Sequence, residues 1–124
     1  MPVNLPTLRT HCLAKPGTTE ERPFGPDTLV FKVMGKMFAL TGDELEPQSV
    51  NLKCDPDDAL FFRKQFEGIK AGYHMDKRHW ITVDLRGSVP ESLIFELIDD
   101  SYELVVAKLP RKAREALKTI RVLE

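Results

Sequence analysis

The segment that most constrains the fold is TLVFKVMGKMFAL, residues 28–40. It is rich in β-branched and aromatic residues, and apolar side chains recur at every second position from Leu29. This period of two indicates strand, and Gly35 can supply the positive φ of a short hairpin loop. We therefore predict a β-hairpin, with a bulge that keeps Met34 out of a positive φ.

Two later segments show the same alternation. They are SVNLKC, residues 49–54, and WITVDL, residues 80–85. Strands of this kind, added to a hairpin, are typical of an antiparallel sheet with one buried face. The sequence thus predicts an antiparallel sheet of four to five strands.

Four other segments are predicted to be helical from their caps and apolar spacing. Asp55 and Pro56 begin one that runs to Gly68 and buries Leu60 and Phe61. Ser88 and Glu91 form a capping box before a long amphipathic helix. The other two are residues 5–14 and a short basic helix after Pro110. The expected architecture is a single α+β domain, residues 1–124, with the helices packed on one face of the sheet.

The composition is that of a globular protein. The chain has 124 residues, 42% of them hydrophobic and 30% charged, which suits one domain. No apolar run approaches the roughly 20 residues of a membrane span, and the start of the chain lacks the pattern of a signal peptide. Cys12 and Cys54 are isolated, so we expect buried thiols and no disulfide. These features predict a cytoplasmic monomer with no membrane association.

The charge is unevenly distributed. The net charge is −1, yet residues 108–121 contain six basic residues and one acid. Such asymmetry allows a basic patch on an otherwise acidic body.

The stretch GYHMDKRHW, residues 72–80, combines the residue types that most often carry function. Catalysis is disfavoured, because no serine or cysteine nucleophile has a suitable setting and His74 and His79 lie five residues apart. Metal binding is disfavoured because the pattern is not H-E-x-x-H and two cations separate the histidines. We expect no catalytic residues, no metal and no cofactor, and hence a protein that is not an enzyme.

Nucleic-acid binding accounts for more of these residues. Cations neutralise phosphates, histidines donate hydrogen bonds, and Tyr73 or Trp80 can stack on a base. The candidate binding residues are Lys70, His74, Lys77, Arg78, His79, Arg111, Lys112 and Arg114.

Two other interpretations of the same stretch stay open. It can be an architectural turn, or it can form the surface of an adaptor for a protein or small ligand, with no nucleic acid involved. A continuous basic face that joins residues 70–79 to residues 108–121 would favour nucleic acid, whereas a concave pocket around His74 and His79 would favour a ligand or an enzyme.

Four segments, PFGPDTLVFKVMGKMFAL, VNLKCDP, GYHMDKRHWITVDL and LIDDSYELVVAKLP, resemble the MmcQ/YjbR family of small bacterial proteins. The resemblance extends from about Glu20 to Arg114. It implies a fold like that of bacterial frataxin (CyaY), and DNA binding, the function with which family members are usually labelled. Frataxins bind iron through an acidic first helix, but LPTLRTHCLA contains no acid, so no iron role is expected. The combined prediction is weak, electrostatic DNA binding with low sequence specificity.

Overall fold

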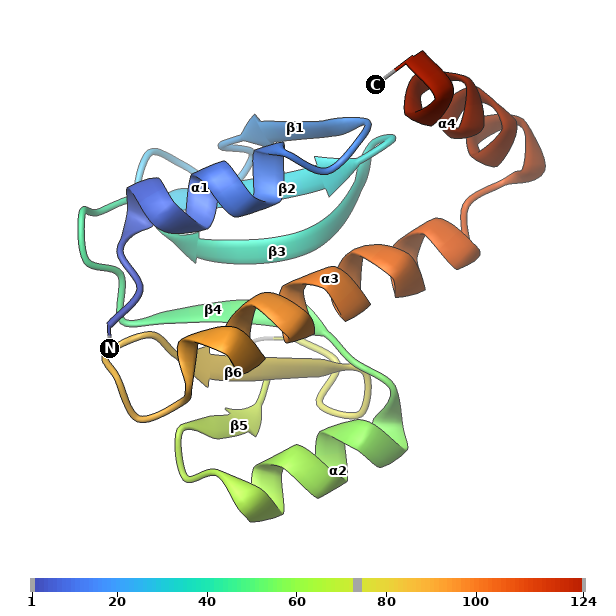
Figure 1. Ribbon diagram of the computed structural model, residues 1–124. Coiled ribbons are helices and arrows are strands. Elements are labelled where there is room, and N and C mark those ends of the chain that lie inside the picture. Colours follow the sequence, from blue (N-terminus) through green and yellow to red (C-terminus); the bar gives the residue numbers. More distant parts are fainter. Residues whose placement is uncertain (1, 73–74, 124) are drawn as a thin grey trace.

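The computed structural model describes residues 2–72 and 75–123, the side chain of residue 123 excepted. Within these ranges six strands form one antiparallel sheet in the order β1-β2-β3-β4-β6-β5 (Figure 1). The strands are β1 (Thr18–Glu21), β2 (Thr28–Val33), β3 (Lys36–Gly42), β4 (Ser49–Lys53), β5 (Ile69–Ala71) and β6 (Trp80–Asp84). The predicted fold class is confirmed. The predicted number of strands was too low, because β1 has the polar sequence TTEE and β5 has three residues.

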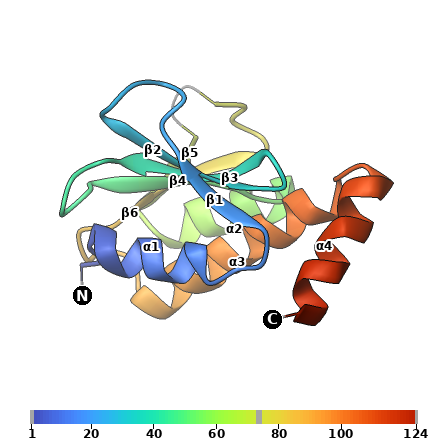
Figure 2. The same ribbon diagram turned by 90° about the horizontal axis from the view of Figure 1, so that it is seen from above.

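Three helices cover one face of this sheet. Figure 2 shows α1 (Leu5–Leu13), α2 (Pro56–Gln65) and α3 (Glu91–Ala107) on the same side, as predicted. The fourth helix, α4 (Arg111–Leu123), follows α3 and extends beyond the sheet. No helix in the described part of the chain is long and apolar enough to cross a membrane.

The β2–β3 hairpin differs from the prediction in its turn. Met34 and Gly35 both have positive φ, 50° and 85°, so the expectation that Met34 avoids this region was wrong. A two-residue loop with two positive φ values matches the twist of the flanking strands, which offsets the strain at Met34. The bulge lies further along the pair: Phe31 faces Ala39 and Lys32 faces Met37, so Phe38 is the extra residue.

The core lies between the sheet and α1 and α3. It is built from alternate residues of the central strands, and Leu29, Phe31, Leu52, Ile81 and Val83 have no exposed surface. Tyr102 of α3 packs at one end of this core. Its ring contacts the Phe38 ring edge-on, and its hydroxyl donates to the Pro16 carbonyl at 2.6 Å.

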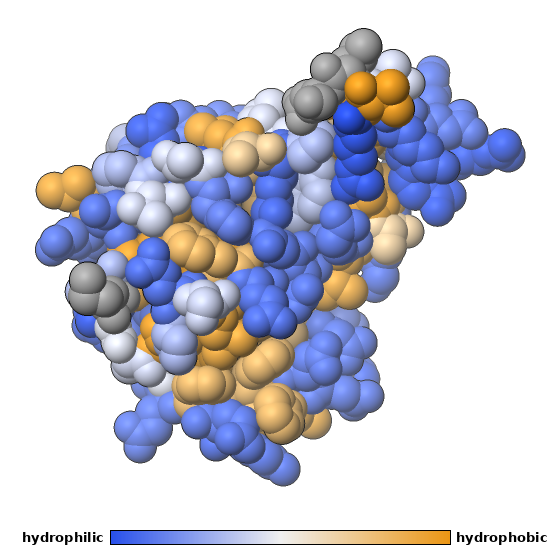
Figure 3. Space-filling view, viewed as in Figure 1, coloured by the Kyte–Doolittle hydropathy of each residue, from blue (hydrophilic) through white to orange (hydrophobic). Residues whose placement is uncertain are grey.

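The buried residues of α2 differ from those predicted. Leu60 and Phe61 are 49% and 57% exposed, and the buried residue of this helix is Ala59. The helix contacts β5 at the border of the sheet, so only a narrow side of it can be covered. Phe62 and Phe66 are half-buried against the core, and Figure 3 shows apolar side chains gathered where α2 approaches α3.

The predicted capping box at the start of α3 is absent. Pro90 occupies the N-cap position, with no side-chain hydrogen bond to the helix. The Ser88 hydroxyl donates to Asp84 Oδ2 at 2.5 Å, because the turn after β6 brings these two side chains together.

One end of the sheet is forked. β3 and β4 pair from Thr41–Val50 to Ala39–Leu52, and there the ladder stops. Beyond that point the buried Ser101 of α3 bridges the two strands: the Lys53 amide donates to Ser101 Oγ at 2.9 Å, and this hydroxyl donates to the Phe38 carbonyl at 2.6 Å. We call this place, where Lys36–Phe38 and Lys53 separate, the β3–β4 fork.

Candidate nucleic-acid interface

The β3–β4 fork opens into a basic pocket of about 270 Å³. Three lysines line it, each from a different element: Lys36 from β3, Lys53 from β4, and Lys108 just after α3. The half-buried Trp80 forms another wall beside Met37 and Val105. Within the described residues none of these lysines forms an ion pair, so their charge is available to a bound anion.

The lysines of this pocket raise one another's electrostatic energy. Burial lowers the pKa of Lys53, and the nearby Lys108 lowers it further, while Asp76 acts in the opposite direction. A neighbouring cation disfavours a protonated amine, whereas an anion placed between the two lysines restores it. The pocket is therefore suited to a phosphate group.

Asp76 organises the turn that precedes Trp80. One carboxylate oxygen accepts from the Arg78 amide at 2.9 Å and the other lies 3.0 Å from His79 Nδ1. The backbone hydrogen bond from Arg78 and the side-chain hydrogen bond from His79 hold the pKa of Asp76 below its usual value. The turn thereby presents Lys77 and Arg78 as exposed side chains.

This turn lies next to the fork. The Cys54 amide donates to the His79 carbonyl at 2.8 Å, and Lys53 pairs with Trp80 in the strand register. Of the candidate residues, Lys77, Arg78 and His79 are therefore brought beside the basic pocket. His74 and Tyr73 lie outside the described residues.

α4 carries the three C-terminal candidates and begins three residues after Lys108. Arg111, Lys112 and Arg114 are exposed on it, and Figure 3 shows the helix as hydrophilic over most of its visible surface. The helix is fixed to the body by Leu117, which is 1% exposed, and by Arg121, whose guanidinium lies 5.6 Å from the centre of the Tyr102 ring.

The turn before Trp80 adjoins the fork, and α4 follows Lys108 at the same end of the molecule (Figure 1). We call the cations of these segments the basic end. Its members are Lys36, Lys53, Lys77, Arg78, Lys108, Arg111, Lys112 and Arg114. Lys70 does not belong to it, because it projects from β5 opposite Thr82. Lys36, Lys53 and Lys108 were not among the candidate binding residues, although Lys108 belongs to the basic segment 108–121. Lys53 and Lys108 each stand at the end of a predicted strand or helix, where chain ends can converge.

Acidic groups gather elsewhere. Asp55, Asp58, Asp100 and Glu103 line a groove between α2 and α3 on the helix side. Burial raises the pKa of Asp100, as do the neighbouring acids Glu96, Asp58 and Asp99. Across the described ranges, no group of three or more His, Cys, Asp or Glu side chains could hold a metal ion. The acidic groove therefore repels phosphates from the helix side.

A family model described as YjbR matches residues 13–104, about three-quarters of the chain. The chain belongs to the YjbR family. YjbR of Escherichia coli K12, an uncharacterized protein, is 34% identical over 110 residues, which cover 89% of this chain and 93% of the relative. The uncharacterized YbdF of Escherichia coli O157:H7 is 40% identical over 96 residues, 77% of this chain and 79% of the relative.

Solved structures show the YjbR-family fold directly. Protein DR2400 of Deinococcus radiodurans, a DUF419 domain, superposes with a TM-score of 0.86 at 38% identity, covering 92% of this chain and 87% of that one. A protein from Pseudomonas syringae superposes with a TM-score of 0.70 at 31% identity. The match covers 82% of this chain and 98% of that one. The family assignment supports the fold.

Proposed function

We propose that this YjbR-family protein binds nucleic acid through its basic end. The observation that carries the proposal is the pocket at the β3–β4 fork, where Lys36, Lys53 and Lys108 converge on Trp80 without an ion pair among the described residues. Converging cations raise the local positive potential, which draws in a polyanion. An adjacent aromatic ring adds a face on which a base can stack.

The distribution of charge supports the same function despite the net charge of −1. Many acids on the body are engaged: Glu20 pairs with Arg9, Asp43 with Arg22, and Asp99 with Lys15. Among the described residues, Arg111 is the one member of the basic end with an ion pair, and it lies 3.1 Å from Glu115. A polyanion therefore meets a basic surface here and an acidic groove on the helix side.

The proposed binding is weak and has low sequence specificity. Lysines and arginines on separate elements contact phosphates, which are the same for every sequence. The basic end contains no asparagine or glutamine, the side chains that pair with adenine in a major groove, and Arg111 on α4 is engaged by Glu115.

Fluorescence anisotropy of labelled DNA tests the proposal, with salt varied from ~50 to ~200 mM. Four phosphate contacts predict that log K falls against log salt with a slope of about −3 to −4, because each contact releases condensed counterions. The absence of binding at the lowest salt would refute nucleic-acid binding and favour the adaptor hypothesis.

Charge reversals locate the site. Lys108→Glu and the double variant Lys77→Glu, Arg78→Glu should each weaken binding and reduce the salt slope. Lys64→Glu is the matched control, because Lys64 is exposed on α2, outside the basic end. Equal losses in all variants would show that net charge, and not this surface, governs binding.

A further inference from the structure

We infer that the ligand is single-stranded nucleic acid, and that it leaves the fork pocket along the open face of β4, β6 and β5. This inference rests on the proposed function and adds the class of nucleic acid and the path of the strand. The open face is the one that α1, α2 and α3 leave uncovered (Figure 2).

The outward side chains of β6 define the path. Ile81 and Val83 are fully buried, so Trp80, Thr82 and Asp84 occupy the alternate positions that face away from the core. Trp80 lines the fork pocket, whereas Thr82 and Asp84 line a second pocket of about 430 Å³. Asp84 lies four residue steps along the strand from Trp80, which is roughly 13 Å.

The second pocket has a fixed cation on one wall. Asp84 Oδ1 accepts from the Arg86 amide at 3.1 Å and from Arg86 Nε at 2.9 Å, while its Oδ2 accepts from Ser88. Burial would raise the pKa of Asp84, but the hydrogen bonds from Ser88 and Arg86 outweigh burial and lower it. Asp84 is thus a carboxylate that holds Arg86 in place, and the two charges largely balance each other, while the guanidinium stays exposed.

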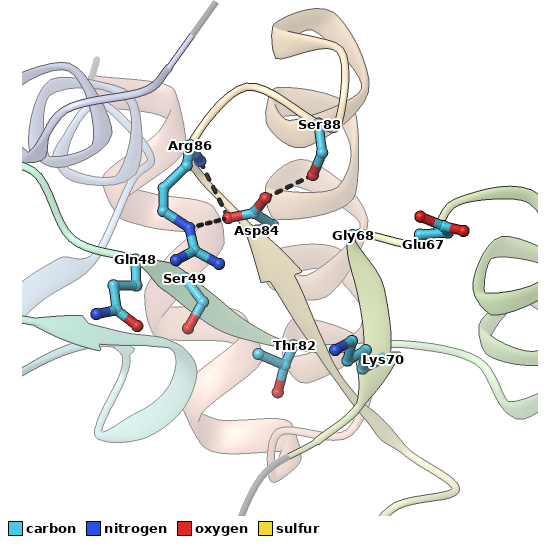
Figure 4. Close-up of a pocket in the computed structure, with 9 residues that line it drawn as sticks. All are labelled: Gln48, Ser49, Glu67, Gly68, Lys70, Thr82, Asp84, Arg86 and Ser88. Atoms are coloured by element: carbon cyan, nitrogen blue, oxygen red, sulfur yellow. Dashed lines mark hydrogen bonds and ion pairs between the residues drawn. The ribbon is translucent and has the colours of Figure 1, made fainter.

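Lys70 stands on the opposite side of the same pocket. Figure 4 shows its side chain beside Thr82, across the hollow from the guanidinium of Arg86. Lys70 has no ion pair among the described residues and is exposed. Gln48 and Ser49 line the pocket on the side of Arg86 and supply neutral hydrogen-bonding groups. The two cations therefore flank polar groups suited to base edges, and the carboxylates of Glu67 and Asp84 also line this pocket.

Gly68 keeps this pocket in shape. A Cβ atom at Gly68 would lie 2.3 Å from Ser88 Oγ and 2.9 Å from Val89 Cγ2, so no side chain fits. The Gly68 carbonyl accepts from the Asp84 amide at 2.8 Å, which ties the start of β5 to the end of β6. The close approach of these two chain segments sets the position of Asp84 and hence of Arg86.

The aromatic residue decides the class of nucleic acid. Bases in a duplex are stacked on one another, so a side chain on a sheet surface can stack only on an unpaired base. Trp80 is the outward-facing aromatic residue of β6 and lies between the lysines of the fork and the second pocket. A single strand can place a base on Trp80 and its following phosphates near Lys70 and Arg86, whereas a duplex can reach only the outer cations.

Trp80 is the single tryptophan of the chain, so its fluorescence reports directly on this site. The experiment titrates the protein with oligothymidylates of increasing length and with a blunt 12-base-pair duplex, at ~50 mM salt. We expect single strands to quench Trp80 and to bind more tightly with length up to a site of at least about 4 nucleotides. The duplex should bind more weakly and leave the fluorescence largely unchanged.

Variants test the path independently of the probe. Lys70→Glu combined with Arg86→Glu should weaken single-strand binding at least tenfold in anisotropy, while Lys64→Glu should not. Trp80→Leu should lower the affinity for the single strand about 5- to 150-fold, which corresponds to the loss of one stacked base. Trp80→Phe should retain most of the affinity. Urea midpoints for each variant separate a loss of binding from a loss of folding.

The outcomes distinguish the two proposals. Equal binding of duplex and single strand, with no quenching and no effect at Lys70 and Arg86, would overturn the strand path and leave the proposed function intact. Failure of both ligands to bind at low salt would overturn both.

Discussion

Replacing Ser101 with alanine tests the β3–β4 fork. This hydroxyl is fully buried and joins the Lys53 amide to the Phe38 carbonyl. Alanine removes both hydrogen bonds without adding volume, and each buried group left unpaired costs about 1–3 kcal/mol. Because the Lys53 bond is only partly buried, we expect a total loss of about 2–4 kcal/mol in the free energy of unfolding.

The assay is urea unfolding followed by Trp80 fluorescence. With a slope of about 1–3 kcal/mol per molar urea, a loss of ~3 kcal/mol lowers the midpoint by roughly 1–3 M. Ser92→Ala is the control on the same helix, because Ser92 is exposed and its replacement should change stability by no more than about 0.5 kcal/mol. A loss below ~1 kcal/mol for Ser101→Ala, with an unchanged slope, would refute the bridging role.

Three further predictions concern the rest of the molecule. Gly17→Ala should lower the melting temperature, because Gly17 has φ +74° and a Cβ would lie 2.8 Å from Leu117 Cδ1; calorimetry measures the shift. Cys12 and Cys54 should resist Ellman's reagent at pH 8 in the folded protein and react in urea, since burial raises the pKa of each thiol to about 12. The lowered folded-state pKa of Asp84 contributes stability above its usual pKa that is lost as the pH falls through the folded value, so urea midpoints from ~pH 5 to ~2 should fall less steeply in Asp84→Asn.

Much of the fold could be predicted from side-chain alternation. The hairpin at residues 28–40 and the strands at 49–54 and 80–85 each bury one set of alternate residues. That pattern can be recognised from neighbouring residues alone, without knowing the rest of the fold. β1 could not be found in this way, because Thr18–Glu21 has no apolar residue and takes its conformation from pairing with β2. The predicted burial of Leu60 and Phe61 was wrong because an apolar residue is buried only if another element covers it, and none of the described elements fully covers these two.

The candidate site was predictable only in part. The cations of residues 77–78 and 111–114 stand out in the sequence because they are clustered. Lys53 does not, and its proximity to Lys108 depends on where the β3–β4 ladder stops and where α3 ends. The second pocket was also not predicted. It depends on contacts of Asp84 with Arg86 and Ser88 in the turn after β6, whereas Ser88 had been predicted to cap the following helix.

The anchoring of α4 has a consequence for its dynamics. Among the described side chains of this 13-residue helix, Leu117 alone is buried, and an isolated helix of this length is marginal in water. Detachment of α4 therefore requires far less free energy than global unfolding, and its amides should exchange hydrogen through a sub-global opening that leaves the sheet intact. A polyanion held by Arg111, Lys112 and Arg114 would close that opening, so the helix would acquire its full protection only in the complex.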